Sequence, residues 1–232
     1  MRELEEIVEE VSKVYLKSGK EAEDYLQRAR RLRGIFGSGF TVVYSWFYSV
    51  PQKWSQVEPR IFELARNTRS FDLNVVLSMP TEDIAGVLKP MIFRNQISLQ
   101  LKKFCEAISQ EFHSWDSFVN ELNRNSIFTI FERLKRHKGI RLSFKNLAAM
   151  KILVGMDDDL IILDRHVARV LGLSRNEQSR YRSRGNMFLD LLSISRSVTQ
   201  KLRRRGLRDV TTAKWSLSVW FDGAKMSAKE LL

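Results

Sequence analysis

Two ionisable residues, Lys145 and Asp164, stand where their side chains could do chemistry together. Lys145 follows a glycine turn and precedes the apolar stretch 147–154, and Asp164 follows the apolar run 160–163. Both patterns predict a residue at the N-terminus of a helix, flanked by buried apolar surface. At such a place the helix dipole and partial desolvation lower the pKa of a lysine and favour its neutral, nucleophilic form. The carboxylate of Asp164 is expected to accept backbone N–H groups at its helix start.

The same residues also permit a purely structural interpretation. Lys145 would then be a solvated surface lysine, and Asp164 would only be the N-cap of its helix. Ser143 is a further N-cap candidate, directly before the helix that carries Lys145. Pattern and spacing alone leave both interpretations open.

The elements that must position these residues are expected to be helices. From Ile97, apolar residues recur at three- and four-residue steps, which predicts a long helix. Two shorter helices are predicted over 118–134, broken near 123–125, and another apolar stripe covers 187–202. Only 42–48 and 160–163 have strand-like composition; we expect the first in a buried helix, and the second is too short for a sheet. The sequence therefore predicts an all-α protein.

The amino-acid composition indicates which class of partner the protein binds. In 232 residues, Lys and Arg outnumber Asp and Glu by 39 to 27, for a net charge of +12, and arginines are dense over 175–208. Such a surplus favours a polyanion, nucleic acid ahead of a membrane surface. No segment is apolar enough to span a membrane, and the N-terminus lacks the apolar stretch of a secretory signal. The single cysteine, Cys105, excludes an internal disulfide. We therefore expect an intracellular protein with no membrane partner.

The segment 138–172 resembles the hairpin-and-aspartate region of the helix-hairpin-helix DNA glycosylases, the superfamily that includes endonuclease III. Its lysine-using members carry a glycine hairpin, a catalytic lysine, a buried helix and an aspartate nineteen residues after the lysine. Lys145 and Asp164 have this spacing, and the run LDRHVARVL at 163–171 is similar to archaeal 8-oxoguanine DNA glycosylases. Weaker similarities occur at 48–59, 88–102 and 217–225.

This resemblance implies two helical lobes with a helix-hairpin-helix motif and a DNA-binding groove between them. The central barrel lobe would cover 38–148, and 1–37 plus 149–232 would form the second lobe. It further implies a monomeric, nucleoid-associated DNA N-glycosylase with AP lyase activity, acting on damaged double-stranded DNA. Lys145 would attack the sugar and form a Schiff base, and Asp164 would stabilise the developing positive charge. Neither a metal nor another cofactor is expected.

The resemblance also implies contacts to DNA. The hairpin residues Gly139, Ile140, Arg141 and Ser143 are expected at a phosphate, although the second glycine of the usual hairpin is missing here. Further candidates are Arg165 and His166 for DNA, Gln52 for the vacated base stack, and Trp220 and Phe221 for the base pocket.

Several alternatives stand beside this hypothesis. The substrate could be an oxidised pyrimidine instead of 8-oxoguanine, or the chain could be a non-enzymatic helix-hairpin-helix DNA-binding module. A basic RNA-binding scaffold is disfavoured because no aromatic RNA-binding motif is present. The spacing of His166 and Arg169 also occurs in tyrosine recombinases, but the last tyrosine, Tyr181, follows too soon.

Overall fold

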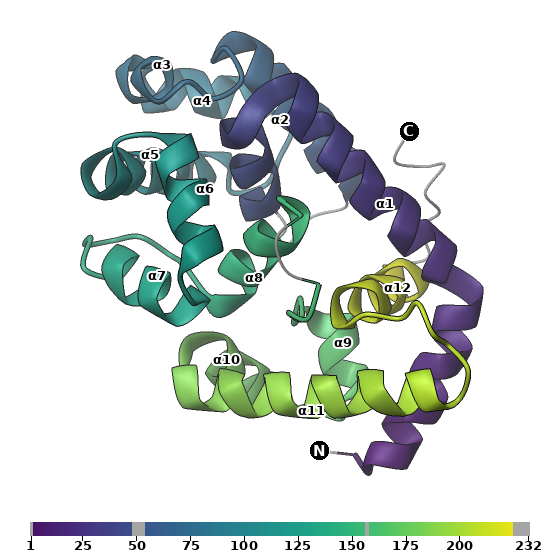
Figure 1. Cartoon of the computed structure of the whole chain (residues 1–232). Coiled ribbons are helices and arrows are strands. Elements are labelled where there is room, and N and C mark those ends of the chain that lie inside the picture. Colours follow the sequence, from purple (N-terminus) through teal and green to yellow (C-terminus); the bar gives the residue numbers. More distant parts are fainter. Residues whose placement is uncertain (1, 48–53, 156–157, 225–232) are drawn as a thin grey trace. The chain divides into compact units, whose positions relative to one another are not determined.

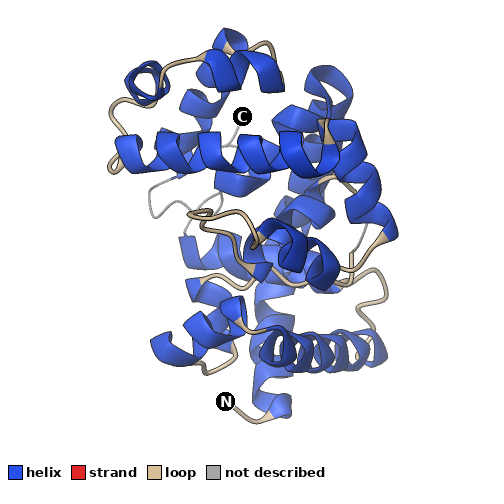
Figure 2. Cartoon of the chain, turned by 90° about the vertical axis from the view of Figure 1, so that its left-hand side faces the viewer, coloured by secondary structure: helices blue, strands red, loops and turns tan. Residues whose placement is uncertain are grey.

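The computed structural model describes residues 2–47, 54–155 and 158–224. Within these ranges all long regular elements are helices joined by loops (Figures 1 and 2). They are α1 (Leu4–Trp46), α2 (Trp54–Asn67), α3 (Leu73–Ser78), α4 (Thr81–Val87), α5 (Arg94–Phe112), α6 (Trp115–Arg124), α7 (Ile127–Leu134), α8 (Phe144–Leu153), α9 (Arg165–Val170), α10 (Arg175–Ser183), α11 (Gly185–Arg204) and α12 (Thr212–Ala224). The expectation of an all-α protein is confirmed.

The helices follow the apolar periodicity closely. The stripe from Ile97 lies on α5, and the two short helices expected over 118–134 are α6 and α7. Between them the hydroxyl of Ser126 accepts the N–H of Thr129 and caps α7. The strand-like run 160–163 is buried loop, and Val42 and Val43 lie in α1. Short apolar runs here therefore mark buried chain and not a sheet.

The chain forms two compact units. Unit 1 comprises Met1–Arg28 and Ser143–Leu232, and unit 2 comprises Ala29–Leu142. The lobes implied by the resemblance, 38–148 and 1–37 plus 149–232, remain a prediction. The division into units places Lys145 in the same unit as Asp164. Lys145 lies on α8, and α8 packs against another helix of unit 1. The ring of Phe144 in α8 stacks on that of Phe188 in α11, with their centroids 5.2 Å apart.

Unit 1 is built around α11 and α12, which pack against each other, with α10 on α11 and α9 on α12 (Figure 1). The first part of α1 joins them through the ring of Tyr25, which meets Phe221 edge-on at 5.6 Å. At the core, the indole of Trp215 donates to the hydroxyl of Thr199 at 3.0 Å, so this fully buried ring keeps a partner. Helices α8 to α12 thus share one core.

Unit 2 has an aromatic core centred on Phe40, Phe71 and Phe104, all fully buried. The indole of Trp115 donates to the carbonyl of Phe71 at 2.6 Å. Gly39 lies against this indole, and a Cβ there would stand 2.6 Å from its Cδ1, so only glycine lets α1 approach so closely. Cys105 is fully buried among these helices. No helix in the described ranges is both long and apolar enough to cross a membrane.

Candidate active site around Lys145 and Asp164

The start of α8 is fixed by a capping box. The hydroxyl of Ser143 accepts the N–H of Asn146 at 3.4 Å, and Oδ1 of Asn146 accepts the N–H of Ser143 at 3.2 Å. The N-cap predicted at Ser143 is therefore confirmed. Lys145 is the second residue of this helix, so its backbone lies in the first turn, at the positive end of the helix dipole.

Lys145 is a buried lysine, with only 8% of its surface exposed. Its pKa is lowered from 10.5 to about 8, first by burial and then by the positive charge of Arg182, while Asp164 opposes the shift. The alternative of a solvated surface lysine is wrong. With a pKa near 8, about a tenth of Lys145 is neutral at pH 7, and the neutral amine is the form that can act as a nucleophile.

Asp164 is the N-cap of α9, as its position in the sequence predicted. Its Oδ1 accepts the N–H groups of His166 and Val167 at 2.9 and 2.8 Å. The side chain is buried, with 7% exposed, and both of its hydrogen bonds within the described residues end on Oδ1. Asp164 is therefore more than a surface cap: it is a buried carboxylate whose charge acts on Lys145.

His166 and Arg165 follow directly on α9 and lie differently. The His166 ring is buried, whereas Arg165 is exposed and donates from Nε to Nε2 of His166 at 3.1 Å. Burial lowers the pKa of His166, and this bond uses its Nε2 as an acceptor. On the other side of the ring lies Gly223 of α12. Of the two predicted DNA contacts, Arg165 is accessible, while His166 is positioned as a packing residue of α9 and α12.

The hairpin before α8 is held by Gln100. Its amide nitrogen donates to the carbonyl of Gly139 at 2.9 Å, and its Oε1 accepts the N–H of Arg141 at 2.7 Å. Gly139 has a φ of 85°, which only glycine adopts easily. The N–H of Ser143 is used by Asn146. Two of the N–H groups expected at a phosphate therefore bond within the chain, which leaves the exposed Arg141 side chain as the stronger candidate.

Phe221, Trp220 and Gln52 are further predicted site residues, and the structure describes the first two. Phe221 is fully buried against Tyr25, so it belongs to the core of unit 1 and does not line an open base pocket. Trp220 is half-buried, with its ring 5.0 Å from that of Phe221, and its contact with a base stays a prediction. Gln52 lies outside the described residues.

Arg182 is the member of this cluster that the sequence did not single out. It lies on α10, where its Nε donates to the carbonyl of Leu163 at 2.9 Å. Burial lowers the pKa of its guanidinium, and Asp164 opposes that shift. No sequence pattern distinguishes Arg182 from its neighbours, because it is one of many arginines in the basic stretch 175–208. The unit thus brings together a buried amine, a buried carboxylate and a half-buried guanidinium from three helices.

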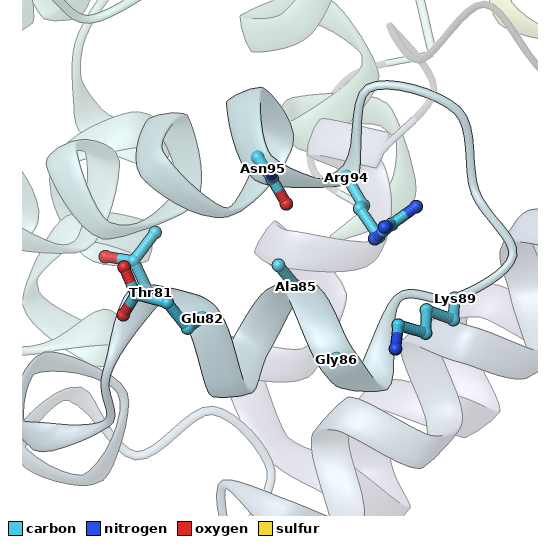
Figure 3. A pocket seen from close by; sticks show the side chains of 7 residues that line it. All are labelled: Thr81, Glu82, Ala85, Gly86, Lys89, Arg94 and Asn95. Atoms are coloured by element: carbon cyan, nitrogen blue, oxygen red, sulfur yellow. The ribbon is translucent and has the colours of Figure 1, made fainter.

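Unit 2 contains a separate surface pocket of about 300 Å³ (Figure 3). It lies between α4 and the start of α5, and Lys89 and Arg94 line one side of it. None of the predicted site residues lines this pocket, and its ionisable groups are exposed or half-buried. It therefore offers less for catalysis than the Lys145 cluster. No group of three or more metal-ligating side chains occurs in residues 2–47, 54–155 and 158–224.

Comparisons of the chain with protein-family models, with curated proteins and with solved structures gave no match.

Proposed function

We propose that this protein is a DNA glycosylase with AP lyase activity, which uses Lys145 as its nucleophile and Asp164 as the assisting carboxylate. The observation that carries the proposal is the burial of an amine beside a buried carboxylate, with a lysine pKa near 8. A lysine that only bound DNA phosphates would stay solvated and charged. A lysine that attacks carbon needs a neutral fraction, which burial beside Arg182 supplies.

The net charge of +12 supports a nucleic acid as the substrate. The resemblance of 138–172 to helix-hairpin-helix glycosylases supports damaged duplex DNA in particular. In this proposal the segment between α7 and α8 is the hairpin that contacts the DNA backbone, with Arg141 as its exposed cation. The DNA groove expected from the resemblance remains a prediction.

The proposed reaction begins with a damaged nucleotide flipped out of the duplex, since its sugar carbon is inaccessible within the stack. The neutral Nζ of Lys145 bonds to C1′, and the bond from C1′ to the base breaks, with its electron pair leaving on the base. Asp164 stabilises the positive charge that develops on the sugar and accepts the proton released by the amine. The C1′–O4′ bond then breaks as the nitrogen lone pair forms the imine, and O4′ keeps the electron pair and takes the proton held by Asp164. The protonated imine to Lys145 makes the 2′ proton acidic. Loss of that proton expels the 3′ phosphate and nicks the strand.

The favoured lesion is 8-oxoguanine, because the run at 163–171 is similar to archaeal enzymes that remove it. The second candidate is an oxidised pyrimidine. A non-enzymatic DNA-binding module is less well supported, because simple binding requires no buried amine beside a buried carboxylate.

The test is an excision assay with the full chain and end-labelled duplexes that carry 8-oxoguanine, an oxidised pyrimidine, an abasic site or no lesion. We expect base release and strand nicking on the 8-oxoguanine duplex, nicking of the abasic duplex, and no product from the undamaged one. Activity confined to the pyrimidine lesion would reassign the substrate. Specific binding without product on any duplex would favour the binding module.

A further inference from the structure

Arg182 has a defined place in unit 1 that goes beyond a basic surface residue. It is the penultimate residue of α10, a helix that packs against α8 and α11 and has no buried residue of its own. Exposed arginines surround it in the sequence, at positions 180 and 184, while Arg182 itself is half-buried. Arg182 is therefore less exposed than these two arginines because it lies on the side of α10 that packs against other helices.

The hydrogen bond of Arg182 reaches the backbone that leads into the carboxylate. Its acceptor, the carbonyl of Leu163, belongs to the residue directly before Asp164, and Leu163 is fully buried. The bond uses Nε, so the terminal nitrogens of the guanidinium are not needed for it. Arg182 thus fixes the peptide from which Asp164 extends.

The charge of Arg182 acts on the same cluster. It interacts with Lys145 of α8 and with Asp164 at the start of α9. A guanidinium retains its proton under all ordinary conditions, whereas an amine does not. The pKa of Lys145 is lowered first by burial and further by this neighbouring positive charge.

We propose that Arg182 is a positioning residue of this site, which fixes the backbone before Asp164 and keeps a permanent positive charge beside the amine of Lys145. As a part of catalysis this inference rests on the proposed function, but the effect of Arg182 on Lys145 is a property of the free protein. The two can therefore be tested apart.

The first experiment measures the titration of Lys145 without DNA. The full chain is labelled with trace acetic anhydride between pH 6 and 11, and the rate of acetylation at Lys145 is read by peptide mass spectrometry. In the wild type we expect a midpoint near pH 8. In Arg182→Met the midpoint should rise by about one pH unit, because a neighbouring positive charge is lost. Arg182→Lys should restore only part of the low midpoint, because a second amine at this half-buried position does not hold its proton as a guanidinium does.

The matched control is Arg180→Met, which removes an exposed arginine two residues away on the same helix. Its midpoint should equal that of the wild type. If Arg182→Met fails to fold, Arg182→Gln carries the same prediction, since it also lacks the charge. An unchanged midpoint in a folded variant without the Arg182 charge would overturn the inference.

The second experiment follows borohydride trapping on an 8-oxoguanine duplex as a function of pH. Arg182→Met should trap about tenfold more slowly at pH 7, in line with a one-unit rise in the lysine midpoint, and should approach the wild-type rate near pH 10. A loss that is equal at every pH would mean that Arg182 has only a structural role. A shifted labelling midpoint without any trapping by the wild type would refute the proposed function and leave the inference about Arg182 standing.

Discussion

The burial of Lys145 opposes the stability of the folded protein. Its amine is buried, yet below pH 8 the amine still carries a proton. The unfolded chain holds the same proton in water with a pKa of 10.5. Burial therefore favours the neutral amine, and the folded state is disfavoured wherever both states are protonated.

This penalty makes the stability of the protein depend on pH. Below pH 8 the full penalty applies, between pH 8 and 10.5 it falls as the folded protein releases the proton first, and above 10.5 it is gone. At pH 7 the gap between the two pKa values corresponds to roughly 3 kcal/mol. Lys145→Met, which keeps the length and loses the charge, should raise the free energy of unfolding at pH 7 by about 1 to 3 kcal/mol. The gain should shrink towards pH 10, as urea denaturation at the two pH values would reveal. A variant destabilised equally at both would contradict the burial of a charged amine.

Asp164 combines two roles that substitution can separate. Asparagine is an equally good N-cap, so Asp164→Asn should retain stability to within a few tenths of a kcal/mol. It removes the negative charge that the proposed reaction needs beside the sugar, however, and should slow single-turnover base release about 100- to 1,000-fold. Asp164→Ala should lose the activity and also about 1 kcal/mol of stability, since His166 and Val167 lose the acceptor of their N–H groups. Base release by Asp164→Asn at the wild-type rate would reduce this carboxylate to a cap.

At the scale of elements, α9 is held in place by the close approach of α12. A Cβ at Gly223 would overlap the imidazole of His166 and stand 2.6 Å from its Cγ. The backbone N–H of His166 in turn binds Asp164. The packing of two helices is thereby linked to the position of the carboxylate.

Gly223→Ala should therefore force α9 and α12 apart. We expect a loss of about 1 to 3 kcal/mol in the free energy of unfolding and a lower rate of base release. Gly34→Ala is the matched control, because a Cβ at this exposed position in α1 meets no atom within 4 Å. That control should gain about 0.5 to 1 kcal/mol, because alanine replaces glycine inside a helix. Equal stability of the two variants, measured by thermal and urea unfolding, would refute the close approach.

The helices and caps of this protein could be predicted from short-range patterns. Ser143 and Asp164 were recognisable as N-caps because a cap depends on residues within one turn. The place of Arg182 could not be predicted in this way, because its bond to Leu163 spans nineteen residues of chain. The same holds for Gln100, which bonds the hairpin about forty residues away. Contacts of this kind depend on tertiary packing, which leaves no local periodicity.

At the scale of the whole molecule, some of the excess arginines have hydrogen-bond or ion-pair partners within the protein, and others are exposed to solvent. Arg205 pairs with Glu5, and Arg203 donates to the carbonyl of Val210, so both stabilise unit 1 internally. Arg180 and Arg184 are exposed one turn apart on and just after α10, the helix that carries Arg182. They are therefore candidates for phosphate contacts, as is the exposed Arg204.

Replacing Arg180 and Arg184 together with alanine should weaken binding to damaged and undamaged duplexes alike. Each lost phosphate contact should reduce the slope of log affinity against log salt by about 0.9. Fluorescence anisotropy between 50 and 300 mM salt measures this slope. Lys13→Ala, an exposed lysine paired with Glu9, is the control and should leave the slope unchanged. Equal slopes for the double variant and the wild type would mean that Arg180 and Arg184 do not contact DNA phosphates.

In the proposed reaction, the amine of Lys145 bonds to the sugar of a damaged nucleotide. Borohydride reduces the imine and leaves a permanent bond, so the adduct can be mapped by mass spectrometry of the digested protein. On an 8-oxoguanine duplex we predict a single modified residue, Lys145, with no adduct in Lys145→Met. Lys151→Met, which removes another lysine of α8, should form it in full. An adduct at any other residue, or undiminished trapping by Lys145→Met, would contradict the proposed role of Lys145 as the nucleophile.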